Sequence, residues 1–106
     1  MAIKSRFRKA MFDVQLLDNR NKPARYTVPG YVIDLYGYTF GVWNNGGNWS
    51  LVDLDTGMRL SGLKSTRKNA VEWFTPNVLD VYERTINQPY YADLVREFEQ
   101  MPVQPF

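Results

Sequence analysis

The sequence contains no cysteine and no histidine among its 106 residues. The lack of cysteine excludes disulfides, thiol nucleophiles and zinc sites built from thiolates. The lack of histidine removes the commonest general base and the commonest metal ligand. No uncharged stretch approaches the roughly 20 apolar residues of a membrane span, and the chain does not start with a signal-peptide core. We therefore expect a small soluble protein that binds and does not catalyse, with no cofactor, no metal and no membrane partner.

The composition is that of a globular chain, with 44% hydrophobic and 15% aromatic residues. This length fits one domain spanning residues 1–106, because two cores of ordinary size need a longer chain. The net charge of +2 is unevenly distributed. Residues 1–25 hold seven cationic and two acidic side chains, whereas residues 72–106 hold two and six. The two ends attract each other within the fold, or the basic end forms a patch for phosphates or an acidic partner.

Alternating apolar residues and β-branched or aromatic runs predict a series of short strands. We expect residues 1–10 to be a basic arm and residues 101–106 to be a tail. Turn-forming residues separate the predicted strands, as at Pro29-Gly30 and at Asn44–Asn48. Short connections of this kind are typical of an antiparallel meander. The strands are predicted over residues 11–17, 31–35, 38–43, 49–54 and 58–63.

The apolar spacing changes from strand-like to helical after Lys64. Ser65 or Thr66 can cap a first helix, and Thr75-Pro76 suits the start of a second. Apolar residues from Tyr91 to Phe98 predict a last short helix. The expected fold is therefore α+β: an antiparallel three- to five-stranded meander followed by two or three short C-terminal helices.

Two sequence patterns offer weak candidates for chemistry. Asp53 and Asp55 would share one face of a strand, which suits a metal or acid–base pair, but Asp55 also begins a turn and can bond its own backbone. The glycines of Asn45–Asn48 join two strands and precede no helix, so they indicate a hairpin and not a phosphate loop. Neither pattern predicts an enzyme, and we expect no catalytic residues.

Aromatic and cationic residues are the better indication of function. Several large rings lie on the predicted strands, namely Tyr31, Tyr36, Tyr38, Phe40, Trp43 and Trp49. Most should fill the core, but one or two exposed rings would form a protein-binding or nucleic-acid-binding face. The cations around the first helix would oppose its dipole and suit a phosphate. The predicted partner-binding residues are Arg6, Arg8, Lys9, Tyr36, Tyr38, Arg59, Lys64, Arg67 and Lys68.

The middle third of the chain resembles small proteins of phages and mobile elements in Gram-positive bacteria. The resemblance rests on Tyr38–Trp43, on a tryptophan strand and Thr-Gly hairpin over Trp49–Met58, and on a helix start over Ser65–Glu72. This layout also resembles the three-stranded DNA-binding arm of tyrosine integrases. The chain departs from it through a basic head and two further helices, so no specific contacts are carried over.

The resemblance implies a non-enzymatic, anti-CRISPR-like phage protein in the cytoplasm of a bacterial host cell. Such a protein would inhibit a host defence nucleoprotein, for example a CRISPR effector, by binding its protein or nucleic-acid-docking surface. One alternative is an accessory protein that binds DNA or RNA with its sheet aromatics and basic residues. Another is a virion or assembly component. The oligomeric state is left open by the sequence.

Overall fold

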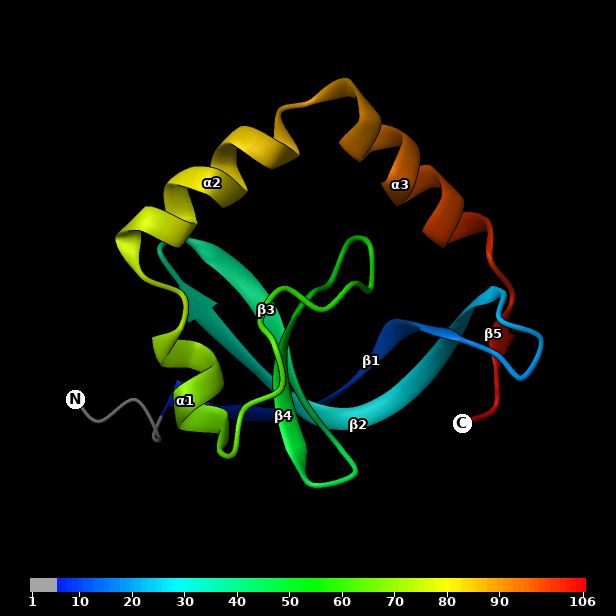
Figure 1. Cartoon of the computed structure of the whole chain (residues 1–106), viewed down its shortest axis with the longest axis horizontal. Coiled ribbons are helices and arrows are strands. Elements are labelled where there is room, and N and C mark those ends of the chain that lie inside the picture. The colour runs from blue at the N-terminus through cyan, green and yellow to red at the C-terminus, as the bar shows by residue number, and fades with distance from the viewer. Residues whose placement is uncertain (1–5) are drawn as a thin grey trace.

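The computed structural model describes residues 6–106, which form a curved antiparallel meander followed by three helices (Figure 1). The strands of the meander pair in chain order. They are β1 (Arg8–Leu17), β2 (Pro23–Leu35), β3 (Tyr38–Asn45) and β4 (Asn48–Asp53). A short β5 (Val103–Gln104) pairs with β2 in parallel. The predicted α+β class, with strands first and helices after them, is confirmed.

Tight turns with positive φ angles connect β2 to β3 and β3 to β4. Tyr36 and Gly37 form the first turn, with φ angles of 53° and 84°. Gly46 and Gly47 form the second, with φ angles of 66° and 93°. Two-residue hairpin turns of this kind need positive φ angles, which glycine adopts without a steric penalty. The first turn holds Tyr36 in the left-handed region with 54% of its surface exposed.

The sheet buries apolar side chains on both faces. One cluster contains Leu51 and is completed by Val71 of the first helix and by Phe74. The other cluster contains Val52 together with Phe12 of β1. Because Leu51 and Val52 are neighbours in β4, their side chains point to opposite faces, and so do the two clusters. Both faces of this small sheet are therefore used to build the core.

The helices follow one another as an arch on one side of the sheet (Figure 1). Their bounds are α1 (Arg67–Glu72), α2 (Pro76–Ile86) and α3 (Pro89–Gln100). The Thr66 hydroxyl caps α1 by accepting the Asn69 backbone N–H at 3.0 Å, and the Thr75 hydroxyl caps α2 in the same way. Proline opens α2 and α3, where its missing N–H is not needed. No helix within residues 6–106 has the length and apolar character to cross a membrane.

Residues 58–63 run beside β4 but do not form the continuous strand that the sequence predicts. Isolated antiparallel bridges join this segment to β4 at Arg59 and at the following Lys64. Between them, the Ser61 hydroxyl accepts the hydrogen bond of the Leu51 backbone N–H at 2.9 Å. A side-chain oxygen thus takes the place of a backbone carbonyl, which interrupts the ladder.

The first half of the sheet is longer than the sequence predicts. Residues 8–10 of the predicted basic arm belong to β1, while residues 1–5 of that arm lie outside the described residues. β2 also continues through Pro29-Gly30, where a break is predicted. Pro29 is tolerated because its ring nitrogen faces away from β1, and β3 pairs with β2 from Tyr31 onward.

The predicted tail, residues 101–106, is in part structured. It contributes β5, whose Val103 lies opposite Arg25 of β2. The ring of Phe106 packs edge-on against Trp43, with 5.6 Å between the ring centroids. This segment therefore covers part of the core cluster that contains Trp43.

Candidate functional site

An arginine lies against two aromatic rings where α1 meets the sheet. The guanidinium carbon of Arg67 lies 4.4 Å from the ring centroid of Tyr31 and 4.8 Å from that of Phe7. The two rings also meet edge to face, with centroids 6.0 Å apart. Contacts of this kind attract the cation to the faces of the rings. Arg67 is the first residue of α1, so the Thr66 cap helps to fix the position of its guanidinium.

An open groove of about 540 Å³ lies beside this stack, and we call it the aromatic groove. Its lining includes Lys9, Met11, Pro29, Tyr31, Asn44 and Trp49. The rings of Tyr31 and Trp49 are half-buried, and their centroids lie 6.1 Å apart. Tyr31 therefore belongs both to the arginine stack and to the groove. Among the described residues that line the groove, Lys9 is the one that carries a charge.

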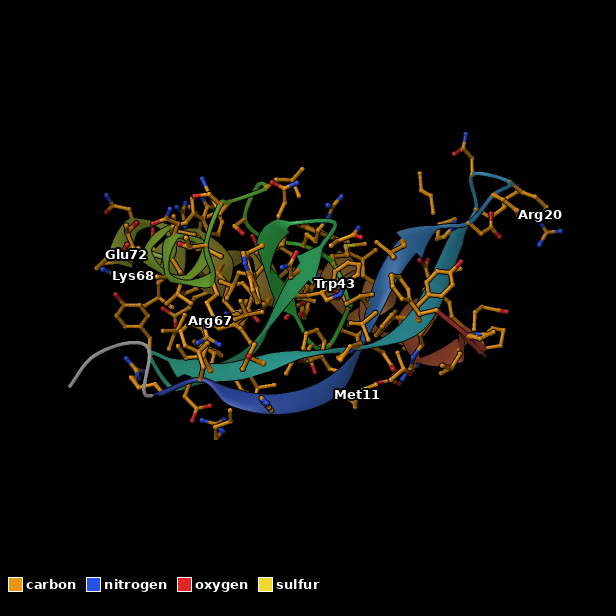
Figure 2. The ribbon with its side chains drawn as sticks, turned by 90° about the horizontal axis from the view of Figure 1, so that it is seen from below. Met11, Arg20, Trp43, Arg67, Lys68 and Glu72 are labelled. Carbon is orange, nitrogen blue, oxygen red and sulfur yellow. The ribbon has the colours of Figure 1, made fainter. Side chains whose placement is uncertain are left out.

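Two further cations, Lys64 and Arg67, lie against residues that line the groove. Lys64 is held beside Trp49 because the backbone N–H of each donates to the carbonyl of the other, at 2.7 and 2.9 Å. Lys68 follows Arg67 on α1, but it is exposed beside Glu72 and does not line the groove (Figure 2). None of the ion pairs within residues 6–106 involves Lys9, Lys64, Arg67 or Lys68. The rim of the groove therefore carries positive charge that no ion pair neutralises.

Three of the nine predicted partner-binding residues thus lie at or beside the groove: Lys9, Lys64 and Arg67. Lys68 does not line it. Arg6 and Arg8 are held instead by Asp34 of β2. Arg8 forms an ion pair with its carboxylate at 3.3 Å, and Arg6 donates to its backbone carbonyl. Hydrogen bonds from Thr39 and Arg8 lower the pKa of the Asp34 carboxyl. These two cations are therefore partly neutralised away from the groove lining.

The other three predicted residues lie elsewhere. Tyr36 packs against Phe74, with 6.1 Å between the ring centroids. Tyr38 donates its hydroxyl hydrogen to Glu83 at 2.8 Å, and this hydrogen bond raises the pKa of the hydroxyl. Arg59 is exposed and lines a separate groove near the end of β1. The structure does not bring these residues to the aromatic groove.

A second polar cluster surrounds Asp53, the last residue of β4, which is only 3% exposed. Its carboxylate accepts hydrogen bonds from the hydroxyls of Tyr82 at 2.9 Å, Tyr91 at 2.6 Å and Thr56 at 2.8 Å. Burial raises the pKa of both tyrosine hydroxyls, and their contacts with Asp53 raise it further. The tyrosines therefore remain protonated and act as donors.

The Asp53 cluster joins the helices to the sheet, since Tyr82 belongs to α2 and Tyr91 to α3. Burial raises the pKa of the nearby Asp55 carboxyl, and the charge of Asp53 adds to this effect. Within residues 6–106, no group of three or more acidic side chains is placed to hold a metal ion. The geometry supports a structural function for Asp53, and the Asp53–Asp55 pair for acid–base chemistry stays a prediction.

Sequence reasoning missed Phe7 in the arginine stack and the two tyrosines of the Asp53 cluster. Phe7 was not identified as a site residue because it lies between Arg6 and Arg8 in a segment predicted to be an arm. Tyr82 and Tyr91 fit the apolar stripes of their helices, and their hydroxyl groups were not matched to an acceptor. A tyrosine in a core stripe is a usable signal, because a buried hydroxyl needs a hydrogen-bond partner.

The aromatic groove is thus the part of the described surface where half-buried rings and cations without ion pairs meet. Comparison with models of protein families, with curated protein sequences and with solved structures finds no match to this chain.

Proposed function

We propose that the chain binds a single-stranded nucleic acid in the aromatic groove. The observation that carries this proposal is the row formed by Arg67, Tyr31 and Trp49, in which a stacked guanidinium continues into two neighbouring half-buried rings. Proteins that bind single strands combine aromatic platforms for the bases with cations that follow the backbone. Both components are present at this groove and are supplied by the sheet and by the start of α1.

Each part of the groove has a task in this proposal. Bases stack on Tyr31 and Trp49, and such stacking is worth about 1–3 kcal/mol per base. Lys9 and Lys64 lie on the lining and rim, where they contact phosphates. The Asn44 amide at the groove offers both a donor and an acceptor to a base edge. The site therefore favours a polyanion with exposed planar faces.

The groove favours a single strand over a duplex because its lining is largely apolar. A base pair inside a duplex keeps its faces stacked on its neighbours and cannot present them to Tyr31 or Trp49. Five of the 11 acidic residues lie on α2 and α3, and among the described residues no acidic one is part of the groove lining. Their charge repels a polyanion from the helices and so directs it toward the basic rim.

Fluorescence anisotropy with a labelled oligonucleotide tests this proposal. We expect Lys9→Glu to weaken binding by about fivefold or more, with a shallower dependence on salt because a phosphate contact is lost. Arg20→Glu is the matched control, because it makes the same charge change in a side chain that is 80% exposed. Arg20 lies at the tip of the β1–β2 hairpin, at the opposite end of the molecule from Arg67 (Figure 2).

Two results would contradict the proposal. One is an absence of binding to any single-stranded oligonucleotide at low salt, where the electrostatic contribution is largest. The other is an equal loss of affinity in Lys9→Glu and Arg20→Glu, which would indicate attraction by net charge alone. Folding of both variants is checked by circular dichroism.

Inhibition of a host defence nucleoprotein stays a prediction from the resemblance, and so does the alternative of a virion component. A groove for single strands offers one physical route to inhibition, namely occupation of a guide or target strand. Addition of the protein to a guide-loaded CRISPR effector, followed by a cleavage assay with wild type and Lys9→Glu, would test that route.

A further inference from the structure

One side of β1 is open. In the described part of the chain, β1 lies at the end of the strand order and pairs with β2. The backbone N–H of Gln15 donates to the Gly57 carbonyl at 2.8 Å, and so points away from β2. Alternate residues of a strand direct their backbone groups to the same side. The N–H and C=O groups of Lys9, Met11 and Asp13 therefore also point away from β2, and they can accept another strand.

The open stretch has definite ends. It begins at Arg8, the first residue of β1. It ends at Val14, because Gly57 occupies the outer side of the next residue, Gln15. The middle residue of this stretch is Met11, whose surface is 64% exposed. An added strand can therefore pair with residues 8–14. This stretch extends equally far on each side of Met11.

We infer that β1 pairs with β1 of a second copy of this chain, in antiparallel orientation and centred on Met11. In this register Met11 lies opposite Met11 of the second copy. Lys9 lies opposite Asp13 of the second copy, and the reverse pair forms on the other side of the symmetry axis. The outward backbone groups of these residues then bond across the seam. The result is a symmetric dimer with one continuous sheet.

The charges of the strand fit this register. Residues directly opposite in an antiparallel pair share a face, so the Lys9 ammonium meets the Asp13 carboxylate of the second copy. The Asp13 carboxylate already accepts from Arg25 at 2.7 Å and from Thr27, which fix its position, and Lys9 of the second copy would meet the 21% of the side chain that stays exposed. The exposed Met11 side chains meet at the centre and shield each other from water.

β1 lacks two of the features that protect edge strands from pairing, namely proline and bulges. Proline, bulges and charged side chains usually prevent such pairing. Residues 8–17 contain no proline, and their register with β2 runs without a bulge from Arg8 opposite Val32 to Leu17 opposite Pro23. Lys9 is a protective charge against most strands, but in this register it faces an aspartate.

The dimer would place two aromatic grooves side by side. The symmetry axis passes through the seam perpendicular to the local sheet, so Lys9 and Tyr31 of both copies lie on the same face. One ligand could then contact both grooves and gain affinity from the linkage. The dimer itself does not depend on what the groove binds, but Lys9 takes part in both contacts. The anisotropy comparison of Lys9→Glu is therefore made at protein concentrations where the chain is monomeric.

Sedimentation velocity on the full chain, without nucleic acid, measures the dimer. We expect a monomer–dimer equilibrium whose dissociation constant rises about tenfold or more in Met11→Lys, because two like charges then meet at the axis. Leu17→Lys is the matched control: Leu17 is also 64% exposed on the same strand, but it lies beyond Gly57. A wild-type chain that stays monomeric at every concentration, or an equal effect of both variants, overturns the inference.

Disulfide trapping gives a second, independent readout, because the chain has no cysteine of its own. Directly opposed strand residues have Cα atoms about 5.5 Å apart, which suits a disulfide. We expect Met11→Cys to form a covalent dimer under mild oxidation much faster than Leu17→Cys. Equal rates in the two variants would overturn the inference. Because no nucleic acid is present, this result is separate from the outcome of the anisotropy experiment.

Discussion

The Tyr91 hydroxyl donates a hydrogen bond of 2.6 Å to the Asp53 carboxylate, across 38 residues of sequence. Within α3, Phe98 is the buried residue, with 3% of its surface exposed. The guanidinium of Arg25 adds a second anchor, since it lies 4.6 Å from the Phe98 ring centroid and donates to the Phe98 carbonyl at 3.0 Å. Polar contacts therefore contribute much of the attachment of α3 to the sheet.

Replacement of Tyr91 by phenylalanine should lower the free energy of unfolding by about 1.5–3 kcal/mol, because a buried carboxylate loses a hydrogen bond. The measurement is urea unfolding followed by circular dichroism. Tyr90→Phe is the control, since Tyr90 is 53% exposed and precedes Tyr91 on the same helix. The change there should stay within about 0.5 kcal/mol. Equal stability of both variants would show that the Asp53 hydrogen bond does not hold α3.

Gly57→Ala should be strongly destabilising. Gly57 has a φ angle of 69°, and a Cβ atom there would lie 2.5 Å from the Phe98 ring and 2.8 Å from the Gln15 backbone nitrogen. We expect a loss of about 2–4 kcal/mol from backbone strain and crowding together. Gly62→Ala is the control, because its added Cβ would meet no atom within 4 Å. Thermal unfolding of both variants gives the comparison, and a similar melting temperature for the two would contradict the prediction.

The ion pair between Asp13 and Arg25 should make stability depend on pH. Burial alone raises the pKa of the Asp13 carboxyl, but hydrogen bonds from Thr27 and Arg25 outweigh it, so the net pKa is lowered. A carboxyl with a lower pKa in the folded state stabilises above its unfolded pKa, and this contribution is lost as pH falls through the folded pKa. Asp13→Asn should therefore destabilise near neutral pH, with the difference shrinking as the pH falls below the unfolded pKa of about 3.9 and through the lower folded pKa.

Urea unfolding at several pH values measures the effect of Asp13→Asn, at protein concentrations where the chain is monomeric. Asp80→Asn serves as the control, because the Asp80 side chain is 70% exposed and pairs with Arg84 on the surface of α2. That change should alter stability by no more than a few tenths of a kcal/mol at any pH. A difference between wild type and Asp13→Asn that persists unchanged in acid would show that the lost stability is not electrostatic.

The order and type of the secondary structure could be predicted because local signals were strong. The helix starts at Thr66 and Thr75 follow from capping chemistry that acts within four residues. The prediction failed where a distant or side-chain partner decides the structure. The strand after Thr56 is interrupted because the Ser61 hydroxyl replaces a backbone carbonyl, and β2 tolerates Pro29 because that position faces away from β1.

The chemistry of the candidate site could be predicted from the sequence, but the set of residues that form it could be predicted only in part. Lys64 and Arg67 were named as cations at a helix start, and they lie beside the groove because Lys64 bonds to the Trp49 backbone and Arg67 begins α1 against Tyr31. Arg8 has the same charge, but β1 places it opposite β2, where Asp34 pairs with it. One-dimensional charge patterns contain no information on which neighbouring strand supplies such a partner.

The parallel pairing of β5 with β2 has a consequence for the order of folding. The meander forms from contacts between strands that are neighbours in sequence, which carry a small loop-closure cost. The pairing of Arg25 with Val103 instead closes a loop that contains most of the chain. We therefore expect β5 to dock late during folding and to exchange its amide hydrogens first in the native state.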